Sequence, residues 1–169
     1  MPEATLLTMR DAHDDDWPVI WPIVREVVST GETCTYPPDI DEQTAKDIWM
    51  NPGNSRVILA IGSDKSVLGT AKISPNQSGR GSHVANASFM VAQASRGMGA
   101  GRALGQRAIE LAREEGFLAM QFNAVVETNT RAVALWNALG FKIIGTVPEA
   151  FDHPTMGFVG LHIMHRKLT

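Results

Sequence analysis

A glycine-rich bend between an apolar strand and an amphipathic helix constrains what this chain can fold into more than any other segment. Residues 91–104 read VAQASRGMGAGRAL. The residues before the bend suit a strand, and apolar residues recur at helical spacing from about Gly99 to Glu115. Glycines at such a junction let the backbone approach a ligand closely, and a helix N-terminus adds unpaired N–H groups and the positive end of the helix dipole. The bend therefore predicts a phosphate or pyrophosphate site.

Two common nucleotide-binding motifs do not fit this bend. A Walker-type loop requires Gly-Lys-Ser/Thr after its glycines, whereas Arg102 follows Gly101 here. A dinucleotide fingerprint requires G-x-G-x-x-G, but the sixth position counted from Gly97 is Arg102, and counted from Gly99 it is a leucine. For the bend alone, a helix entry that binds nothing is the alternative.

The spacing Arg96-x-x-Gly99-x-Gly101, behind a strand that ends Phe-Met-Val, resembles the pyrophosphate loop of the GNAT superfamily of acetyl-CoA-dependent N-acetyltransferases. This resemblance implies acetyl-CoA as the cosubstrate, held by the strand end, the loop and two helices. The residues that it implies for cofactor binding are Phe89, Met90, Val91, Arg96, Gly97, Met98, Gly99, Ala100, Gly101, Arg102, Asn129 and Trp136.

A second segment, from Asn129 to Phe141, resembles the next helix of that family, N-x-x-A-x-x-L-Y-x-x-x-G-F. Asn129 suits a helix N-cap, and Gly140 suits the position after the C-cap. Two motifs in the right order, separated by one helix and one strand, are far more specific than either alone. The resemblance is strong over residues 55–147 and weaker in the flanks.

Composition is that of an ordinary soluble globular protein. The chain has 169 residues, 44% of them hydrophobic and 20% charged, so we expect a single GNAT N-acetyltransferase domain over residues 1–169. The net charge of −3, without a long basic run, argues against nucleic acid or a membrane as partner. The single cysteine, Cys34, and the absence of a recognisable signal peptide suit the cytoplasm.

The rest of the chain predicts the order β-α-α-β-β-β-α-β-α-β-β. We expect strands at 5–10, 56–61, 67–73, 83–91, 118–126, 141–146 and 158–166, helices before Gly31, from Asp41 to Met50, at 99–115 and from Asn129, and a loop at 148–157. This order matches the α/β (α+β) GNAT fold, which implies a mixed, mostly antiparallel sheet of about seven strands, helices on both faces and a splay at the cofactor strand.

Acetyl transfer to an amine requires a polarised thioester carbonyl, a neutral amine and a stabilised leaving thiolate. Backbone N–H groups at the end of strand 89–91 can polarise the carbonyl, and one such donor is worth about 3 kcal/mol in other enzymes. The family's usual acid is the tyrosine of L-Y-x-x-x-G-F, and Trp136 stands at that position. An indole N–H donates a hydrogen bond but does not transfer a proton. Trp136 therefore either borders pantetheine or packs in the core.

Asparagines on two expected strands are the candidate catalytic residues. The combination S-H-V-x-N-A-x-F-M-V with F-N-x-V-x-E-T-N resembles the branch of the superfamily that acetylates proline analogues of the azetidine-2-carboxylate type. The resemblance implies that Asn86 and Asn123 are catalytic and that Asn86 also contacts the acceptor. Asparagine is unfavourable within strands, which points to function, although structural asparagines are the alternative.

By the same resemblance, the linker between the first two helices lines the acceptor pocket, so Thr35 and Tyr36 are expected to bind substrate. A tyrosine packed under a proline turn is the alternative for Tyr36. No general base stands out; Glu127, His83 and His153 are candidates, and a water chain would make a dedicated base unnecessary.

The sequence therefore predicts transfer of acetyl from acetyl-CoA to the amine of a small molecule, with an amino acid or amino-acid analogue as the expected acceptor. Phosphinothricin-type acetyltransferases are the near alternative. Protein or peptide N-acetylation and a non-catalytic CoA-binding sensor are further alternatives. No metal is expected, and a homodimer is left open.

Overall fold

A single seven-stranded sheet organises the computed structural model, which describes residues 6–51 and 53–169. The strands are β1 (Thr8–Asp11), β2 (Arg56–Ile61), β3 (Val67–Pro75), β4 (Val84–Val91), β5 (Ala119–Val126), β6 (Lys142–His153) and β7 (Gly157–Lys167). The α-helices are α1 (Trp17–Ser29), α2 (Glu42–Trp49), α3 (Ala100–Glu114) and α4 (Thr130–Ala138), and short 3-10 turns cover Asp14–Asp16, Gly79–Gly81 and Gln93–Ser95. No helix in the described ranges is long and apolar enough to cross a bilayer.

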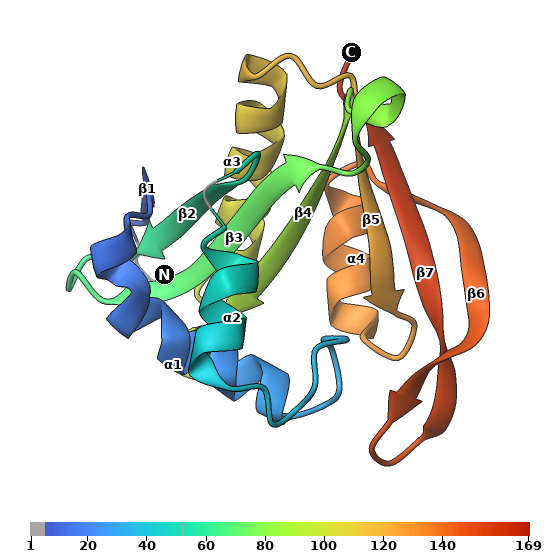
Figure 1. The fold of residues 1–169 in the computed structure, drawn as a ribbon, viewed down its shortest axis with the longest axis horizontal. Coiled ribbons are helices and arrows are strands. Elements are labelled where there is room, and N and C mark those ends of the chain that lie inside the picture. Colours follow the sequence, from blue (N-terminus) through green and yellow to red (C-terminus); the bar gives the residue numbers. More distant parts are fainter. Residues whose placement is uncertain (1–5, 52) are drawn as a thin grey trace, which may run out of the picture.

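The strands lie in the order β1-β2-β3-β4-β5-β7-β6, and every neighbouring pair is antiparallel except β4 and β5. Helices α1 and α2 lie on one face of the sheet and α3 and α4 on the other (Figure 1). This arrangement confirms the predicted element order and the mixed, mostly antiparallel sheet. The first strand begins at Thr8, later than expected. The expected first residue of this strand, Thr5, lies outside the described residues.

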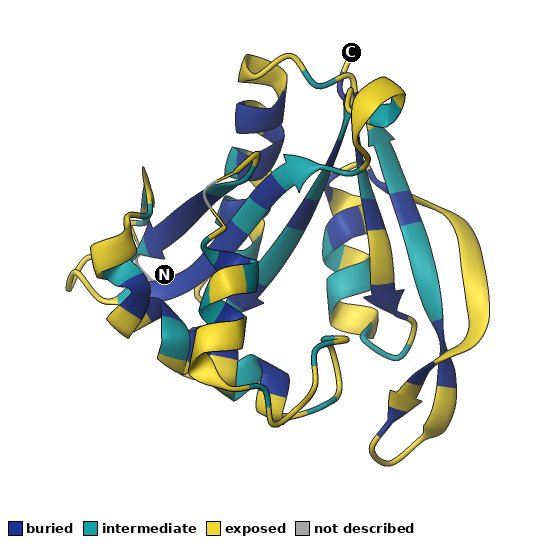
Figure 2. Cartoon of the chain, viewed as in Figure 1, coloured by how far each residue is buried: buried dark blue, intermediate teal, exposed yellow. Residues whose placement is uncertain are grey.

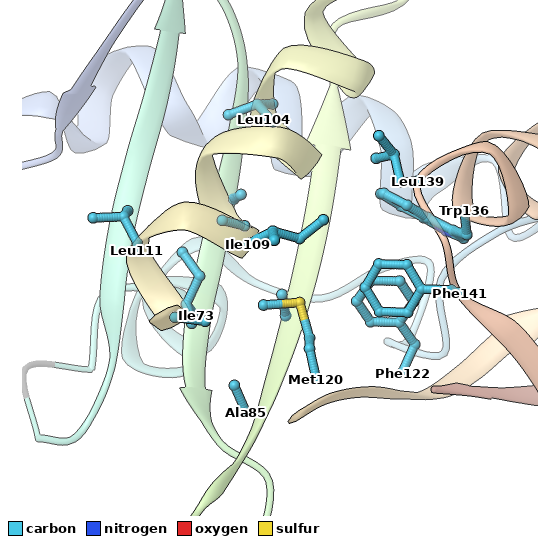
Figure 3. Close-up of a cluster of buried hydrophobic side chains, with 14 of the residues drawn as sticks. Ile73, Ala85, Leu104, Ile109, Leu111, Met120, Phe122, Trp136, Leu139 and Phe141 are labelled. Atoms are coloured by element: carbon cyan, nitrogen blue, oxygen red, sulfur yellow. The ribbon is translucent and has the colours of Figure 1, made fainter. Parts of the chain in front are cut away.

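Side-chain alternation along the strands divides the interior into two cores. In one core, α1 and α2 pack against the sheet, and Met90 represents the even-numbered side chains of β4 there. The other packs α3 and α4 on the opposite face and contains Ala85 and Ala87 (Figures 2 and 3). Asn86 and Ser88 therefore share the α1 face with Met90, whereas Phe89 faces α3 and α4.

The sheet opens between β4 and β5. These parallel strands pair only at Val84↔Ala119 and Ala85↔Met120. The β3–β4 ladder continues as far as Gly69↔Val91, so β4 stays straight with β3 while β5 leaves it. The predicted splay at the cofactor strand is therefore present, and it begins after Ala85.

Aromatic side chains fill the α4 side of this gap. The ring of Trp136 lies 4.6 Å from that of Phe89 on β4 and 4.8 Å from that of Phe122 on β5. Phe141 stacks on Phe122 at 4.3 Å between ring centroids, as Figure 3 shows. Helix α4 therefore keeps the two strands apart through a packed aromatic cluster.

The loop predicted at 148–157 is wrong, because β6 continues to His153 and only a tight turn separates it from β7. Pro148 lies within β6. The ladder accommodates it in a bulge between Val147 and Phe151, where Glu149 has a positive φ of 50°. Strand β6 is at the edge of the sheet, where a proline and a bulge cost few hydrogen bonds.

Helices α3 and α4 pack closely because α3 carries a glycine at the contact. A Cβ atom on Gly105 would lie 2.7 Å from Leu139 and 3.0 Å from the six-membered ring of Trp136. We therefore expect Gly105→Val to destabilise the fold by about 1–3 kcal/mol through overpacking.

Thermal melting tests this expectation, and about 2–4 °C is expected per kcal/mol for a chain of this size. Gln106→Val, at an exposed neighbouring position of α3, is the matched control for the intrinsic helix preference of valine. Equal melting temperatures for the two variants would contradict the close contact.

Candidate active site

The glycine loop presents backbone N–H groups at the start of α3. Gly97 and Gly99 have φ of 80° and 82°, a left-handed conformation that other residues rarely adopt. A Cβ atom on either would meet nothing within 4 Å, so the backbone angle, not crowding, requires glycine. Gly99 is the N-cap of α3, which leaves the first N–H groups of a 15-residue helix without intrahelical partners. The loop thus has the geometry of an anion site.

Three arginines accompany these N–H groups. Arg96, Arg102 and Arg131 line a cavity of about 660 Å³ that runs from the glycine loop along α4. None of the three forms an ion pair with the described part of the chain, although five ion pairs occur elsewhere in it. Their charges are therefore available to an anionic ligand.

All the residues predicted to bind the cofactor line this cavity except Met98. Met98 lies in the loop and is 38% exposed. The loop, the end of β4 and the first turn of α4 thus come together as expected.

The register of β4 identifies which of its N–H groups face the gap. In an antiparallel ladder, alternate residues exchange both hydrogen bonds with one neighbouring strand. The Ala92 N–H donates to Leu68, 2.9 Å away, and the Asn76 N–H donates to Val84, so the even-numbered residues of β4 bond to β3. The N–H groups of Phe89 and Val91 therefore point toward β5, which has splayed away. These N–H groups, and not that of Met90, are free to polarise a carbonyl.

A second cavity, of about 370 Å³, adjoins the first across the splay. Both cavities are lined by Thr33, Met90, Asn129 and Trp136, among others. The residues predicted for the acceptor and for catalysis, namely Thr35, Tyr36, Asn86 and Asn123, line the second cavity. The segment between α1 and α2 thus faces the strands that carry the asparagines.

The two asparagines differ in whether their side-chain amides already have hydrogen-bond partners. The Asn123 amide nitrogen donates to the side-chain oxygen of Asn76 at 2.6 Å, and its oxygen accepts from Gln121 at 3.0 Å. The half-buried Asn86 side chain has no hydrogen-bond partner among residues 6–51 and 53–169. Asn86 therefore has its whole amide available to a ligand, and Asn123 about half.

Burial controls the two titratable groups on the acceptor side. Burial raises the pKa of the Tyr36 phenol to about 12, and the neighbouring Cys34 adds to the effect. Burial likewise raises the pKa of the Cys34 thiol. Near neutral pH both groups keep their protons, so Tyr36 can donate a hydrogen bond to a ligand and Cys34 is not an activated nucleophile.

Trp136 is 7% exposed, and its six-membered ring points at α3. Its indole nitrogen has no hydrogen-bond partner within the described ranges, which also contain no buried polar side-chain atom that lacks a partner. The N–H therefore reaches solvent in the cavities that Trp136 lines. The residue packs in the core and also presents a donor at the junction of the cavities.

The remaining candidates take structural positions. Asn129 caps α4, because its side-chain oxygen accepts from the Ala132 N–H at 3.3 Å. The Glu127 carboxylate accepts from the Gly160 N–H at 2.6 Å and so ties β5 to β7. His83 is exposed and lines neither cavity. His153, by contrast, is buried and lines the larger cavity.

Sequence reasoning did not single out Arg131 or Glu32, which also line the larger cavity. Arg131 carried a signal that could have revealed it. It lies in the first turn of α4, where a positive charge opposes the helix dipole, so a ligand is a natural reason for its presence. Glu32 carried no such signal, since its place in the cavity depends on the path of the segment after α1.

Comparison with known proteins identifies the family. Residues 7–141 match the Acetyltransferase (GNAT) family, and this chain belongs to it. The chain is 34% identical over 100 residues to N-acetyltransferase aca1 of Schizosaccharomyces pombe, which is 59% of this chain and 48% of aca1. It is 32% identical over 106 residues to protein SPT10 of Saccharomyces cerevisiae, 60% of this chain and 17% of SPT10. The chain thus spans half or less of these relatives.

Solved structures confirm the predicted GNAT fold. A GCN5-related N-acetyltransferase from Kribbella flavida is 58% identical, with a TM-score of 0.92 and 99% of each chain covered. A phosphinothricin acetyltransferase from Sinorhizobium meliloti, solved with AcCoA, shares the fold at 23% identity and a TM-score of 0.83, covering 95% of this chain and 88% of that one. A single domain over all 169 residues stays a prediction.

The glycine loop allows a direct test of anion binding. We expect Gly99→Asp to weaken acetyl-CoA binding by more than about ten-fold relative to Gly99→Asn. Asparagine has nearly the same shape and tolerates the left-handed conformation, so the comparison isolates the negative charge from backbone strain. Calorimetry measures the affinity, and thermal melting checks the fold. Equal affinities in the two variants would show that the pyrophosphate does not bind at this loop.

Proposed function

We propose that this protein transfers the acetyl group of acetyl-CoA to the amine of a small molecule, and that the acceptor is an amino acid or an amino-acid analogue. The observation that carries the proposal is the junction of two cavities at the splay of β4 and β5. One cavity has the glycine loop and unpaired arginines, and the other has an amide-lined wall. A volume of about 370 Å³ suits a small acceptor.

The family and two solved relatives support acetyl-CoA as cosubstrate. The phosphinothricin acetyltransferase from S. meliloti was solved with AcCoA, and yncA from Salmonella typhimurium, described as a putative acetyltransferase, with acetyl-CoA. In this chain the glycine loop, Arg96, Arg102 and Arg131 fit the phosphates of such a ligand, since they combine free N–H groups with unpaired positive charge.

The thioester oxygen and the acceptor then each have partners in this chain. Acetyl-CoA supplies a thioester that a neutral amine attacks. The N–H groups of Phe89 and Val91 are placed to donate to the thioester oxygen as negative charge develops on it. Asn86 and Asn123 orient the acceptor, and Thr35 and Tyr36 border it on the other side. As the N–C bond forms and the C–S bond breaks, the nitrogen loses one proton and the leaving thiolate takes one up. Trp136 supplies a hydrogen-bond donor and packing but no transferable proton, so this proton passes from nitrogen to sulfur through water or another group.

The acceptor class is tested by a panel of amines, with release of the CoA thiol as readout. The panel includes proline, azetidine-2-carboxylate, phosphinothricin, free lysine and a peptide with an N-terminal alanine. We expect the highest kcat/KM for an amino acid or analogue. The highest kcat/KM for the peptide would instead support protein N-acetylation. Binding of acetyl-CoA without turnover of any amine would support a sensor.

Assembly and location stay predictions. The outer strand β6 and its hairpin partner β7 expose apolar side chains, Ile144 at 61% and Phe158 at 67%, which supports a homodimer through this edge. The cytoplasmic location is a prediction from the sequence.

Asn86 and Asn123 provide the next prediction. One hydrogen bond to a charged group is worth about 1.5–3 kcal/mol, so Asn86→Ala should lower kcat/KM by roughly ten-fold to a hundred-fold while acetyl-CoA affinity stays nearly unchanged. Asn123→Ala should act in the same direction with a smaller loss, because Asn76 and Gln121 already occupy part of its amide.

Steady-state kinetics with the best acceptor measure both variants, and melting temperatures verify folding. Asn137→Ala is the matched control, because Asn137 is an exposed asparagine of α4 that lines neither cavity. If Asn86→Ala and Asn123→Ala both keep the wild-type kcat/KM, the asparagines are structural.

Trp136 provides a separate prediction through a matched pair of variants. Trp136→Phe and Trp136→Tyr leave similar voids beside Phe89 and Phe122, so both should melt below the wild type and close to each other. Trp136→Phe should keep most of kcat, because the indole donates no proton. Trp136→Tyr should exceed Trp136→Phe in kcat if protonation of the thiolate limits the rate. A large loss of kcat in Trp136→Phe, with acetyl-CoA affinity intact, would contradict the view that Trp136 only packs.

A further inference from the structure

His153 is the one histidine held in the interior, at the end of β6, where the turn to β7 begins. Its side chain is buried, with 8% of the residue exposed, and its ring lies 6.5 Å from that of Phe151. The backbone N–H groups of Thr155 and Met156 both donate to its Nδ1 at 3.2 Å. The tight turn therefore fixes both the position and the orientation of the imidazole.

These two bonds assign the tautomer of the neutral ring. A nitrogen that accepts from backbone N–H groups carries no proton, so the proton lies on Nε2. The Thr155 hydroxyl, 3.4 Å from Nδ1, can donate to the same side. His153 thus offers Nε2–H as a donor on the edge of the ring that faces away from the turn.

Nε2 is the ring nitrogen that is accessible to solvent, and His153 lines the larger cavity. Nε2 has no hydrogen-bond partner in the part of the chain that the structure describes, and no polar side-chain atom buried in that part lacks a partner. Nε2 must therefore reach solvent, and the cavity is the space that His153 lines. The ring is buried, and backbone hydrogen bonds hold one of its nitrogens in place. The other nitrogen can therefore donate a hydrogen bond to a ligand in the cavity.

The surroundings of His153 place it away from the glycine loop. A Cβ atom on Gly31 would lie 3.8 Å from the ring of Pro154, so the β6–β7 turn meets the segment between α1 and α2. Figure 1 shows both the hairpin tip and that segment beyond the ends of β4 and β5. Gly101, in the first turn of α3 after the glycine loop, instead faces Leu135 and Val91. Thr33, next to Glu32 in the same segment, lines both cavities.

We propose that His153 is a specificity-determining residue that donates its Nε2–H to a carboxylate or carbonyl oxygen of the acceptor. This inference rests on the proposed function, because it assigns the acceptor's recognition group. The charged groups that line the cavity fit such an acceptor. Glu32 is the only carboxylate among the lining residues and is close in sequence to Gly31, whereas the arginines belong to α4, the loop and α3. Glu32 and His153 line the larger cavity and not the smaller one, so the acceptor would extend from the smaller cavity past Thr33, which lines both. An acceptor that carries both an amine and a carboxylate therefore finds a carboxylate and an N–H donor on the same side of the junction.

An oxygen of acetyl-CoA could use the same donor, so the test separates the two sources. His153→Phe keeps a ring but removes both nitrogens, and His153→Gln keeps an N–H donor near the position of Nε2. Each variant is assayed with the best carboxylate-bearing acceptor and with the same amine lacking its carboxylate. Acetyl-CoA affinity is measured by calorimetry.

We expect His153→Phe to raise KM for the carboxylate-bearing acceptor by roughly ten-fold to a hundred-fold, with acetyl-CoA affinity unchanged. The amine without the carboxylate should change by less than about three-fold, and His153→Gln should recover part of the loss. Equal losses with both amines would overturn the proposal, as would weaker acetyl-CoA binding with an unchanged acceptor KM. If no amine is acetylated by the wild type, the proposed function fails instead.

Nitrogen NMR of the wild-type protein gives a test that does not depend on a variant folding. Long-range proton–nitrogen spectra should show Nδ1 of His153 without a proton. In the presence of acetyl-CoA, the addition of the carboxylate-bearing acceptor should shift the Nε2–H resonance, and the decarboxylated amine should not. A proton on Nδ1, or an unmoved Nε2–H resonance at saturating acceptor, would overturn the proposal.

Discussion

The interrupted pairing between β4 and β5 is the constraint on which the rest of the structure depends. Two residue pairs hold the strands together at one end, and beyond Ala85 each strand keeps only its outer neighbour. Backbone polar groups in a protein interior need partners, so a sheet left open at this point must present them to solvent or to a ligand. Both cavities meet at this opening, and the free N–H groups of Phe89 and Val91 follow from the register of β3 and β4 alone.

The aromatic cluster on the α4 side explains why the opening persists. Phe89 and Phe122 belong to the two separated strands, and Trp136 packs against both. Closing the strands would expel the indole from a buried site, which would forfeit its apolar burial. Gly105 allows α4 to come close enough to α3 for this packing. Trp136 thus maintains the opening by packing, and its indole N–H can donate a hydrogen bond but cannot transfer a proton.

Local signals in the sequence predicted the parts of the site whose geometry is local. The positive φ of Gly97 and Gly99, the Asn129 cap and the left-handed Gly140 each depend on a few neighbouring residues, and motif spacing located them. The segment predicted as a loop at 148–157 is mostly strand, because a proline such as Pro148 costs little in an edge strand, and edge position is a property of the whole sheet. From the sequence, His153 was only one of two candidate histidines. Its role depends on a turn that fixes Nδ1 and on the position of the adjacent Pro154 beside Gly31, which lies more than a hundred residues earlier in the chain.

The unpaired stretch of β4 is, in effect, a sheet edge placed inside a molecule. Edges of sheets bind extended chains that carry amide groups, because such chains continue the ladder. An acyl carrier with an extended arm that contains amide groups therefore suits this opening better than a carrier with a purely hydrocarbon arm. Enclosure by α4 on one side and by the segment between α1 and α2 on the other also keeps this edge from joining strands of other proteins. The same break in the ladder that creates a binding surface is thus protected from the aggregation that open edges invite.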